Sequence, residues 1–129
     1  MKYNVALVGA TGMVGRKMLQ VLSERNVPVE NYYLFASARS AGKKIEFLGK
    51  EYTVIELNEQ NVRDTKVDIA LFSAGASTSK AFAPLFSECG ATVIDNSSQW
   101  RTDPNIPLVV PEVNAHDIDW NTGIIAKPN

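Results

Sequence analysis

Short apolar runs alternate along the chain with stretches whose apolar residues recur at helical spacing. Continuous apolar runs rich in β-branched residues occupy residues 3–10, 67–74 and 91–97. Such runs are typical of strands that are buried on both faces. Residues 32–37 and 123–126 resemble them and predict two more strands. The pattern therefore predicts several strands of one buried sheet.

Two helices are expected between these strands, at residues 13–26 and 77–90. The apolar face expected for the first helix consists of Val14, Met18, Val21 and Leu22. Charged and amide side chains of that helix point the other way, as in an amphipathic helix. The second helix is expected to open with the hydroxyl caps Ser77 and Thr78 and to close at Gly90.

The remaining segments complete an alternation of strands and helices. Residues 43–57 predict two short strands that turn at Leu48–Gly49–Lys50, and residues 114–120 predict one helical turn. Strands joined by crossover helices form parallel sheets. We therefore expect residues 1–129 to form a single α/β domain, with a Rossmann-like doubly wound, mostly parallel sheet and helices on both faces.

The composition of the chain argues against several classes of binding partner. The 129 residues carry a net charge of −1, and their pI is about 5.8, which is not typical of a nucleic-acid-binding or membrane-binding surface. The first apolar run is too short for a signal peptide or a membrane span. One cysteine, Cys89, and one histidine, His116, leave neither a disulfide framework nor a metal-ligand cluster. We expect a cytoplasmic protein that binds neither nucleic acid nor membranes nor metal.

The first strand and the first helix are joined by the sequence GATGMVG, in which Gly9, Gly12 and Gly15 are spaced three apart. A glycine loop between a buried strand and a helix is the context of a dinucleotide-binding motif. In it, Gly9 makes the tight turn, Gly12 lets the backbone approach a pyrophosphate, and Gly15 lets the helix pack closely. The alternative is a tight strand-to-helix turn that binds no ligand.

The loop after the second strand indicates which dinucleotide is bound. An enzyme that uses NAD usually has Asp or Glu at this strand end, to bind the ribose hydroxyls. Here the loop carries Ser37, Arg39 and Ser40, with Lys43 and Lys44 close behind. Hydroxyls and a guanidinium suit a 2′-phosphate, which a carboxylate would repel. The loop favours NADP; the alternative is a solvated basic loop.

Six motifs, in this order and spacing, resemble aspartate-β-semialdehyde dehydrogenase: GATGMVG, SARSAGK, LFSAGAS, VIDNSSQWR, LVVPEVN and GIIAKPN. The resemblance implies an enzyme whose cysteine attacks the aldehyde of aspartate semialdehyde. The hemithioacetal passes a hydride to NADP, and phosphate releases the thioester as aspartyl phosphate. Biosynthesis of lysine, threonine and methionine uses the reverse direction.

The same resemblance places that cysteine directly after the asparagine of the last motif, at position 130, whereas the chain ends at Asn129. We therefore expect the NADP-binding portion of a longer enzyme, without its catalytic and dimerisation domain, without a catalytic residue and inactive alone. The full-length enzyme is expected to be a homodimer or homotetramer. Cys89 matches no catalytic motif and is expected to be a small packing residue. His116 is expected to be a surface or capping residue.

Candidate site residues follow from the two loops together with the resemblance. The expected cofactor-binding residues are Gly9, Thr11, Gly12, Met13, Val14, Gly15, Ser37, Arg39, Ser40, Ser73, Ala74, Gly75, Thr78 and Asn96. Arg101 and Asn129 are expected to bind substrate or phosphate; the alternative for Arg101 is a surface ion pair with Asp103. Ser77 could equally be only an N-cap, and Lys127 departs from the small or polar residue usual in the last motif.

Two other functions remain open. A related acyl-phosphate reductase, such as N-acetylglutamyl-phosphate reductase, uses the same chemistry, but the second and fourth motifs fit it less well. A free-standing, non-catalytic NADP-binding or sensor module would need no nucleophile at all. The residue encoded after Asn129 distinguishes the enzyme from the module.

Overall fold

A computed structural model of the chain describes residues 2–24, 28–97, 99–100, 106 and 123–126. The strands are β1 (Tyr3–Val8), β2 (Val29–Ala36), β3 (Lys44–Phe47), β4 (Lys50–Thr53), β5 (Ile55–Glu56), β6 (Ile69–Phe72), β7 (Thr92–Asp95) and β8 (Ile124–Ala126). The helices are α1 (Met13–Glu24), α2 (Glu59–Asp64) and α3 (Ala76–Glu88). The predicted helical turn at 114–120, with His116, lies outside the described residues.

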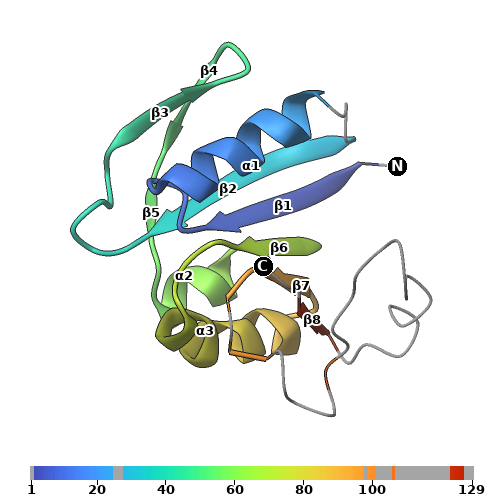
Figure 1. Ribbon diagram of the computed structural model, residues 1–129. Coiled ribbons are helices and arrows are strands. Elements are labelled where there is room, and N and C mark those ends of the chain that lie inside the picture. Colours follow the sequence, from blue (N-terminus) through green and yellow to red (C-terminus); the bar gives the residue numbers. More distant parts are fainter. Residues whose placement is uncertain (1, 25–27, 98, 101–105, 107–122, 127–129) are drawn as a thin grey trace.

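The main sheet has six strands in the order β5-β2-β1-β6-β7-β8. Each neighbouring pair is parallel. From β1 the chain moves outward to β2 and β5, and it then returns to β6 on the other side of β1 (Figure 1). The winding direction therefore reverses between β1 and β6, and the prediction of a Rossmann-like doubly wound fold is confirmed.

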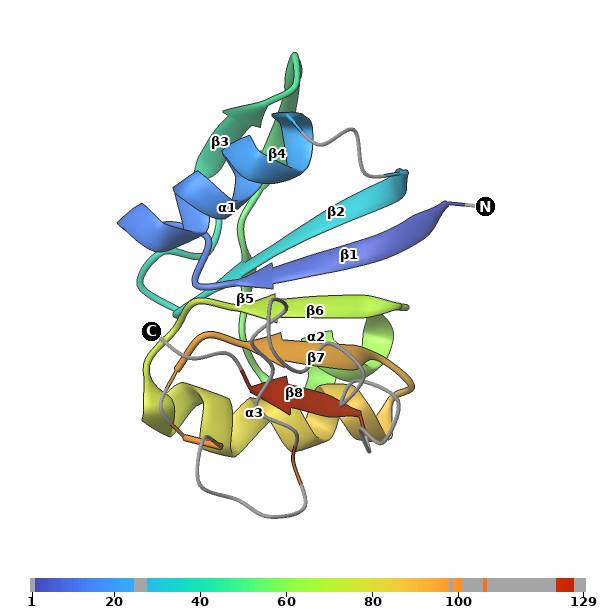
Figure 2. The ribbon, with the colours of Figure 1, turned by 45° about the vertical axis from the view of Figure 1, so that its right-hand side comes forward.

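The sheet separates two apolar layers, with α1 on one face and α2 and α3 on the other (Figure 2). On the α3 face, the ring of Phe86 meets those of Phe35 and Phe72 edge-on, with ring centroids 5.5 Å apart in both pairs. On the α1 face, Leu19 packs against a smaller cluster that includes Leu7 and Leu34. Because neighbouring strand residues point to opposite faces, a continuous apolar run serves both layers.

The predicted hairpin forms, but the run 43–57 contains more than a hairpin. β3 and β4 pair antiparallel around Leu48 and Gly49, which both have positive φ, 52° and 74°. After the buried Val54 the chain leaves the hairpin, and β5 joins the main sheet beside β2. The prediction of only two strands here was therefore wrong, because a two-residue strand has no periodicity of its own.

Helix α2 was also missing from the prediction. Asn58 caps it, since its side-chain oxygen accepts a hydrogen bond from the backbone N–H of Asn61 at 2.8 Å. The helix has six residues, and Val62 is the buried one. One apolar contact in six residues is too short a pattern to reveal helical spacing.

The buried face of α1 differs from the predicted one. Gly15 and Leu19 are its buried residues, whereas Val14 and Val21 are 48% and 42% exposed. The helix lies so close to the preceding turn that Gly15 is buried against Gly9 and Ala10, and Leu19 is buried one turn later. Of the predicted face, Val14 and Val21 are therefore exposed, whereas Met18 and Leu22 are half-buried and Met18 packs against the smaller apolar cluster.

The ends of α3 give one correction and one confirmation. Gly75 is the N-cap and makes no side-chain capping bond, whereas Ser77 and Thr78 lie within the first turn. The prediction of hydroxyl caps was therefore wrong, because the short connection from β6 brings the helix start forward to Ala76. Gly90 follows the C-cap with a φ of 97°, as expected of a closing glycine.

Cys89 was expected to be a small packing residue, and it is exposed instead. It is the C-cap of α3, between the exposed residues Glu88 and Gly90. In the part of the chain that the structure describes, no helix is long and apolar enough to cross a membrane. The same described residues include no group of three or more His, Cys, Asp or Glu side chains placed to hold a metal ion.

Candidate functional site

The carboxyl ends of four neighbouring strands meet at one edge of the sheet. β2, β1, β6 and β7 end there at Ala36, Val8, Phe72 and Asp95 (Figure 1). The loops that follow these strands contain most of the predicted site residues. In an open α/β sheet, ligands bind at this edge, at the point where the winding reverses.

The turn after β1 is built around Gly9. The backbone N–H groups of Gly9 and Ala10 both donate to the carbonyl of Phe35, at 2.9 and 3.2 Å. Gly9 has a φ of 92°, and a Cβ atom there would lie 2.9 Å from Ser73 Oγ. Ser73 Oγ lies 3.1 Å from the carbonyl oxygen of Val8 and 3.3 Å from that of Gly9, as a donor to both. Ser73, a predicted cofactor residue, thus ties the glycine turn to the end of β6.

The other two glycines have different surroundings. A Cβ atom on Gly15 would overlap the carbonyl oxygen of Gly9 and lie 3.1 Å from Ala10 Cα, so only glycine fits without a shift. A Cβ atom on Gly12 would meet only the Gly9 oxygen, at 3.6 Å, and Gly12 is exposed. Helix α1 begins at the next residue, Met13, which is 89% exposed. The first N–H groups of a helix have no partner within it, so this end suits an anion.

A cavity of about 390 Å³ lies beside the glycine turn. Its lining residues are Val8, Gly9, Thr11, Ala36, Ser37, Ala38, Leu57, Ala74, Thr78 and Phe82. The predicted residues among them are Gly9, Thr11, Ser37, Ala74 and Thr78, so the structure brings together loops that are far apart in sequence. The loops come from β1, β2, β5 and β6.

Sequence reasoning missed the apolar walls of this cavity, Leu57 and Phe82. Phe82 lies one turn after Thr78 on α3, and this i, i+4 spacing could have placed both side chains on one face. No comparable signal marked Leu57, because it follows the strand that the pattern had merged with the hairpin.

The loop after β2 contributes cations and hydroxyls at the rim. The backbone N–H groups of Ser40 and Ala41 donate to the carbonyl of Ser37, at 2.9 and 3.0 Å, and so form a tight turn. Arg39 is exposed in this turn, and among the described residues no carboxylate forms an ion pair with it. A guanidinium without a protein carboxylate is available to an anionic ligand.

Other predicted residues lie outside this cavity. Val14 and Asn96 line an apolar groove of about 320 Å³ on the α1 face, together with Lys17, Met18, Val21, Leu22 and Leu71. Gly75, also predicted, is exposed at the start of α3. The predicted site is therefore spread over two hollows, one lined by Gly9 and Thr11 and the other by Val14 and Asn96. Arg101, Asn129 and Lys127 lie outside the described residues.

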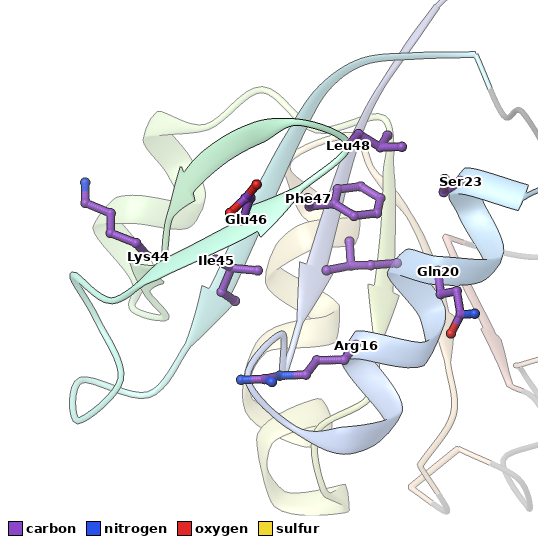
Figure 3. Close-up of a pocket in the computed structure, with 9 residues that line it drawn as sticks. Arg16, Gln20, Ser23, Lys44, Ile45, Glu46, Phe47 and Leu48 are labelled. Carbon is purple, nitrogen blue, oxygen red and sulfur yellow. The ribbon is translucent and has the colours of Figure 1, made fainter.

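A further cavity, of about 510 Å³, lies between α1 and the β3–β4 hairpin (Figure 3). Its lining residues are Arg16, Leu19, Gln20, Ser23, Lys44, Ile45, Glu46, Phe47 and Leu48. None of them is a predicted cofactor residue. Although it is larger, this cavity lies against the hairpin and away from the strand ends, so we do not assign the dinucleotide to it.

Known proteins match both the sequence and the fold. Residues 4–121 match the family model described as semialdehyde dehydrogenase, NAD binding domain. Aspartate-semialdehyde dehydrogenase of Aquifex aeolicus is 60% identical over 131 aligned positions, which cover 100% of this chain and 38% of the relative. The chain thus spans about two fifths of that relative's length.

Solved structures agree with this match. Aspartate semialdehyde dehydrogenase II of Vibrio cholerae, complexed with ASA, has a TM-score of 0.93 and 50% identity, covering 100% of this chain and 42% of that one. The Candida albicans enzyme, solved with NADP, has a TM-score of 0.80 and 26% identity, covering 98% of this chain and 42% of that one. The resemblance noted in the six motifs is confirmed. The chain belongs to the family of semialdehyde dehydrogenase NAD-binding domains.

Proposed function

We propose that this chain binds NADP and is the cofactor-binding domain of an aspartate-semialdehyde dehydrogenase. The whole enzyme would interconvert L-aspartate 4-semialdehyde, phosphate and NADP with 4-aspartyl phosphate and NADPH. The observation that carries the proposal is the glycine turn at the winding reversal, with a cavity beside it that has Ser37 in its wall. The family match and the NADP in the Candida albicans relative support it.

The cavity suits the adenosine half of the cofactor. Leu57 and Phe82 offer apolar walls for a base, and Thr78 adds a hydroxyl. Ser37 and the exposed Arg39 stand where the second strand ends, which is where a 2′-phosphate is recognised in this fold. The guanidinium can donate two parallel hydrogen bonds to a phosphate. These features favour NADP over NAD.

The glycine turn would take the pyrophosphate, because Gly12 leaves room for close approach and α1 presents its N-terminus there. The nicotinamide half would extend toward the ends of β6 and β7, near Ser73 and Asn96. When bound, nicotinamide supplies the hydride acceptor. The residues of this chain bind and orient it, while Arg101 and Asn129 are proposed to hold phosphate or substrate.

For the whole protein, we propose a cytoplasmic homo-oligomer acting on these small molecules, with no nucleic-acid or membrane partner. A free and exposed thiol at Cys89 supports a reducing compartment. The assembly, as a homodimer or homotetramer, rests on the family resemblance.

Substitution of Gly12 tests the cofactor assignment. Gly12→Ala is expected to weaken NADP binding at least about tenfold, because a methyl group would occupy the space into which the pyrophosphate must come. The nearest atom to the new Cβ is 3.6 Å away, so the melting temperature without ligand should change little. Titration calorimetry and a thermal melt measure the two effects. Normal NADP binding by Gly12→Ala would show that the turn is purely structural.

The isolated chain is expected to lack dehydrogenase activity. Its one cysteine, Cys89, ends α3 and precedes β7, so it lies at the opposite edge of the sheet from the glycine turn. A nucleophile must lie within reach of the reacting carbon, which this thiol does not. The assay is NADPH absorbance with aspartate semialdehyde and phosphate. Phosphate-dependent NADPH formation that Cys89→Ser abolishes would contradict this expectation, whereas Cys89→Ser should leave NADP affinity unchanged.

A further inference from the structure

The last residue of β7, Asp95, is fully buried. Its carboxylate accepts hydrogen bonds from Ser79 Oγ at 2.7 Å, the backbone N–H of Ser97 at 2.9 Å and Ser97 Oγ at 2.6 Å. A buried carboxylate is costly unless it is fully hydrogen-bonded, and bonds to a charged acceptor are among the strongest in proteins. These three hydrogen bonds therefore hold the Asp95 side chain in one orientation.

The two serines that donate to Asp95 also accept hydrogen bonds from residues that follow β7. Ser97 Oγ accepts a hydrogen bond from the backbone N–H of Gln99 at 3.2 Å. Ser79 Oγ, on α3, accepts one from the indole Nε1 of Trp100 at 2.8 Å. Each hydroxyl thus accepts from the loop and donates to Asp95. Through Ser97 the carboxylate is linked to Gln99 within the loop after β7, and through Ser79 this loop is joined to α3 at Trp100.

This network lies at the edge of the sheet where the cofactor is proposed to bind. Asp95 points to the α3 face, where Ser79 is. The next residue, Asn96, lines the groove on the opposite face together with Val14. The backbone N–H of Asn96 donates to the carbonyl of Phe72, at the end of β6. The orientation of Asn96 therefore depends on how the chain is held on either side of it, at Asp95 and Ser97.

We propose that Asp95 is a positioning residue for the nicotinamide half of the cofactor site. It contacts no cofactor itself; it holds Asn96 and the loop after β7 in the arrangement that the bound dinucleotide requires. The inference rests on the proposed function. It assigns to a buried carboxylate a role that neither the motifs nor the cavity linings indicate, since Asp95 lines none of the three hollows described.

The hydrogen bonds explain why an amide cannot replace this carboxylate. Both hydroxyls already accept from the loop, so each must donate to Oδ2 of Asp95. If the amide nitrogen of an asparagine stood there, both hydroxyl hydrogens would lack an acceptor. If the amide were turned round, its nitrogen would face the N–H of Ser97. In either orientation of the asparagine amide, at least one buried hydrogen-bond donor faces another donor and lacks an acceptor.

The experiment compares NADP with 2′,5′-ADP, which carries only the adenosine half and the 2′-phosphate. Both are titrated against the chain carrying Trp120→Phe, so that Trp100 is the one tryptophan left to report by fluorescence. Asp95→Asn is expected to weaken NADP binding at least about tenfold. It should change 2′,5′-ADP affinity less than about twofold and shift Trp100 emission to the red. Asp68→Asn is the matched control, because exposed Asp68 accepts a bond from Asn4 at the opposite edge.

Ser97→Ala and Ser79→Ala remove one hydroxyl each and decide the question if Asp95→Asn does not fold. We expect both to weaken NADP binding about threefold or more while 2′,5′-ADP binding is kept. Equal loss of both ligands, or a lower melting temperature with unchanged affinities, would overturn the inference and leave Asp95 a purely structural residue. If the unmutated chain binds 2′,5′-ADP and NADP equally well, the nicotinamide half adds no affinity. The inference about Asp95 then fails, while the proposed function stands. If the unmutated chain binds neither, the proposed function fails as well.

Discussion

Alanine in place of Gly15 is expected to lower the free energy of unfolding by about 1–3 kcal/mol and to weaken NADP binding with it. The added Cβ would overlap the carbonyl oxygen of Gly9 and press on Ala10. Helix α1 would have to move away from the glycine turn. Because the same turn is proposed to receive the pyrophosphate, stability and affinity should fall together. Chemical denaturation without ligand and calorimetry with NADP measure the two effects.

Gly12→Ala is the matched comparison for this substitution, since it adds the same methyl group three residues earlier. There the new Cβ would meet only Gly9, at 3.6 Å. Gly12→Ala should therefore affect binding alone, whereas Gly15→Ala should affect both. An unfolding midpoint for Gly15→Ala equal to that of the unmutated chain would show that the helix accommodates the methyl group. The role of Gly15 in close packing would then be wrong.

Arg39→Ala is expected to weaken NADP binding by about ten- to a hundredfold and to leave NAD binding nearly unchanged. A charge-assisted hydrogen bond to a phosphate contributes roughly 1.5–3 kcal/mol, which corresponds to that range of affinity. In the described part of the chain, Arg39 has no carboxylate to which it is paired, so its loss should disturb the unliganded fold little. Calorimetric titration of both cofactors gives the two affinities directly.

Arg63→Ala removes the same charge from a site remote from the loop. Arg63 lies on α2, where its Nε donates to Glu59 at 2.9 Å. If the effect of Arg39→Ala came only from the change in net charge, Arg63→Ala would reproduce it. Equal affinities of the unmutated chain for NADP and NAD would contradict the assignment of Ser37, Arg39 and Ser40 to the 2′-phosphate.

Much of the fold could be predicted because its signals are local. Buried strands such as β1 and β6 are continuous apolar runs, and Gly90 closes α3 as expected. The elements that the sequence pattern did not predict are short: β5 has two residues and α2 has six. Elements of that length are held by neighbours such as β2, not by a pattern of their own.

The candidate site shows the same division. The glycine turn and the basic loop were predictable, because glycines at fixed spacing and a strand end without a carboxylate are visible in the residues themselves. The walls formed by Leu57 and Phe82 were not, since neither residue has unusual chemistry. Their place in the cavity follows from where β5 and α3 pack.

By itself, the sequence determined the order of the longer strands and helices and the glycine turn, because these depend on short-range spacing and on backbone conformations such as the φ of 92° at Gly9. Tertiary structure alone decided that Leu19 is the large buried side chain of α1, and that Ser79 is hydrogen-bonded both to the buried Asp95 and to Trp100. These two hydrogen bonds join residues 16 and 21 positions apart along the chain. They form only when the parallel strands have taken their lateral order, which no local pattern encodes.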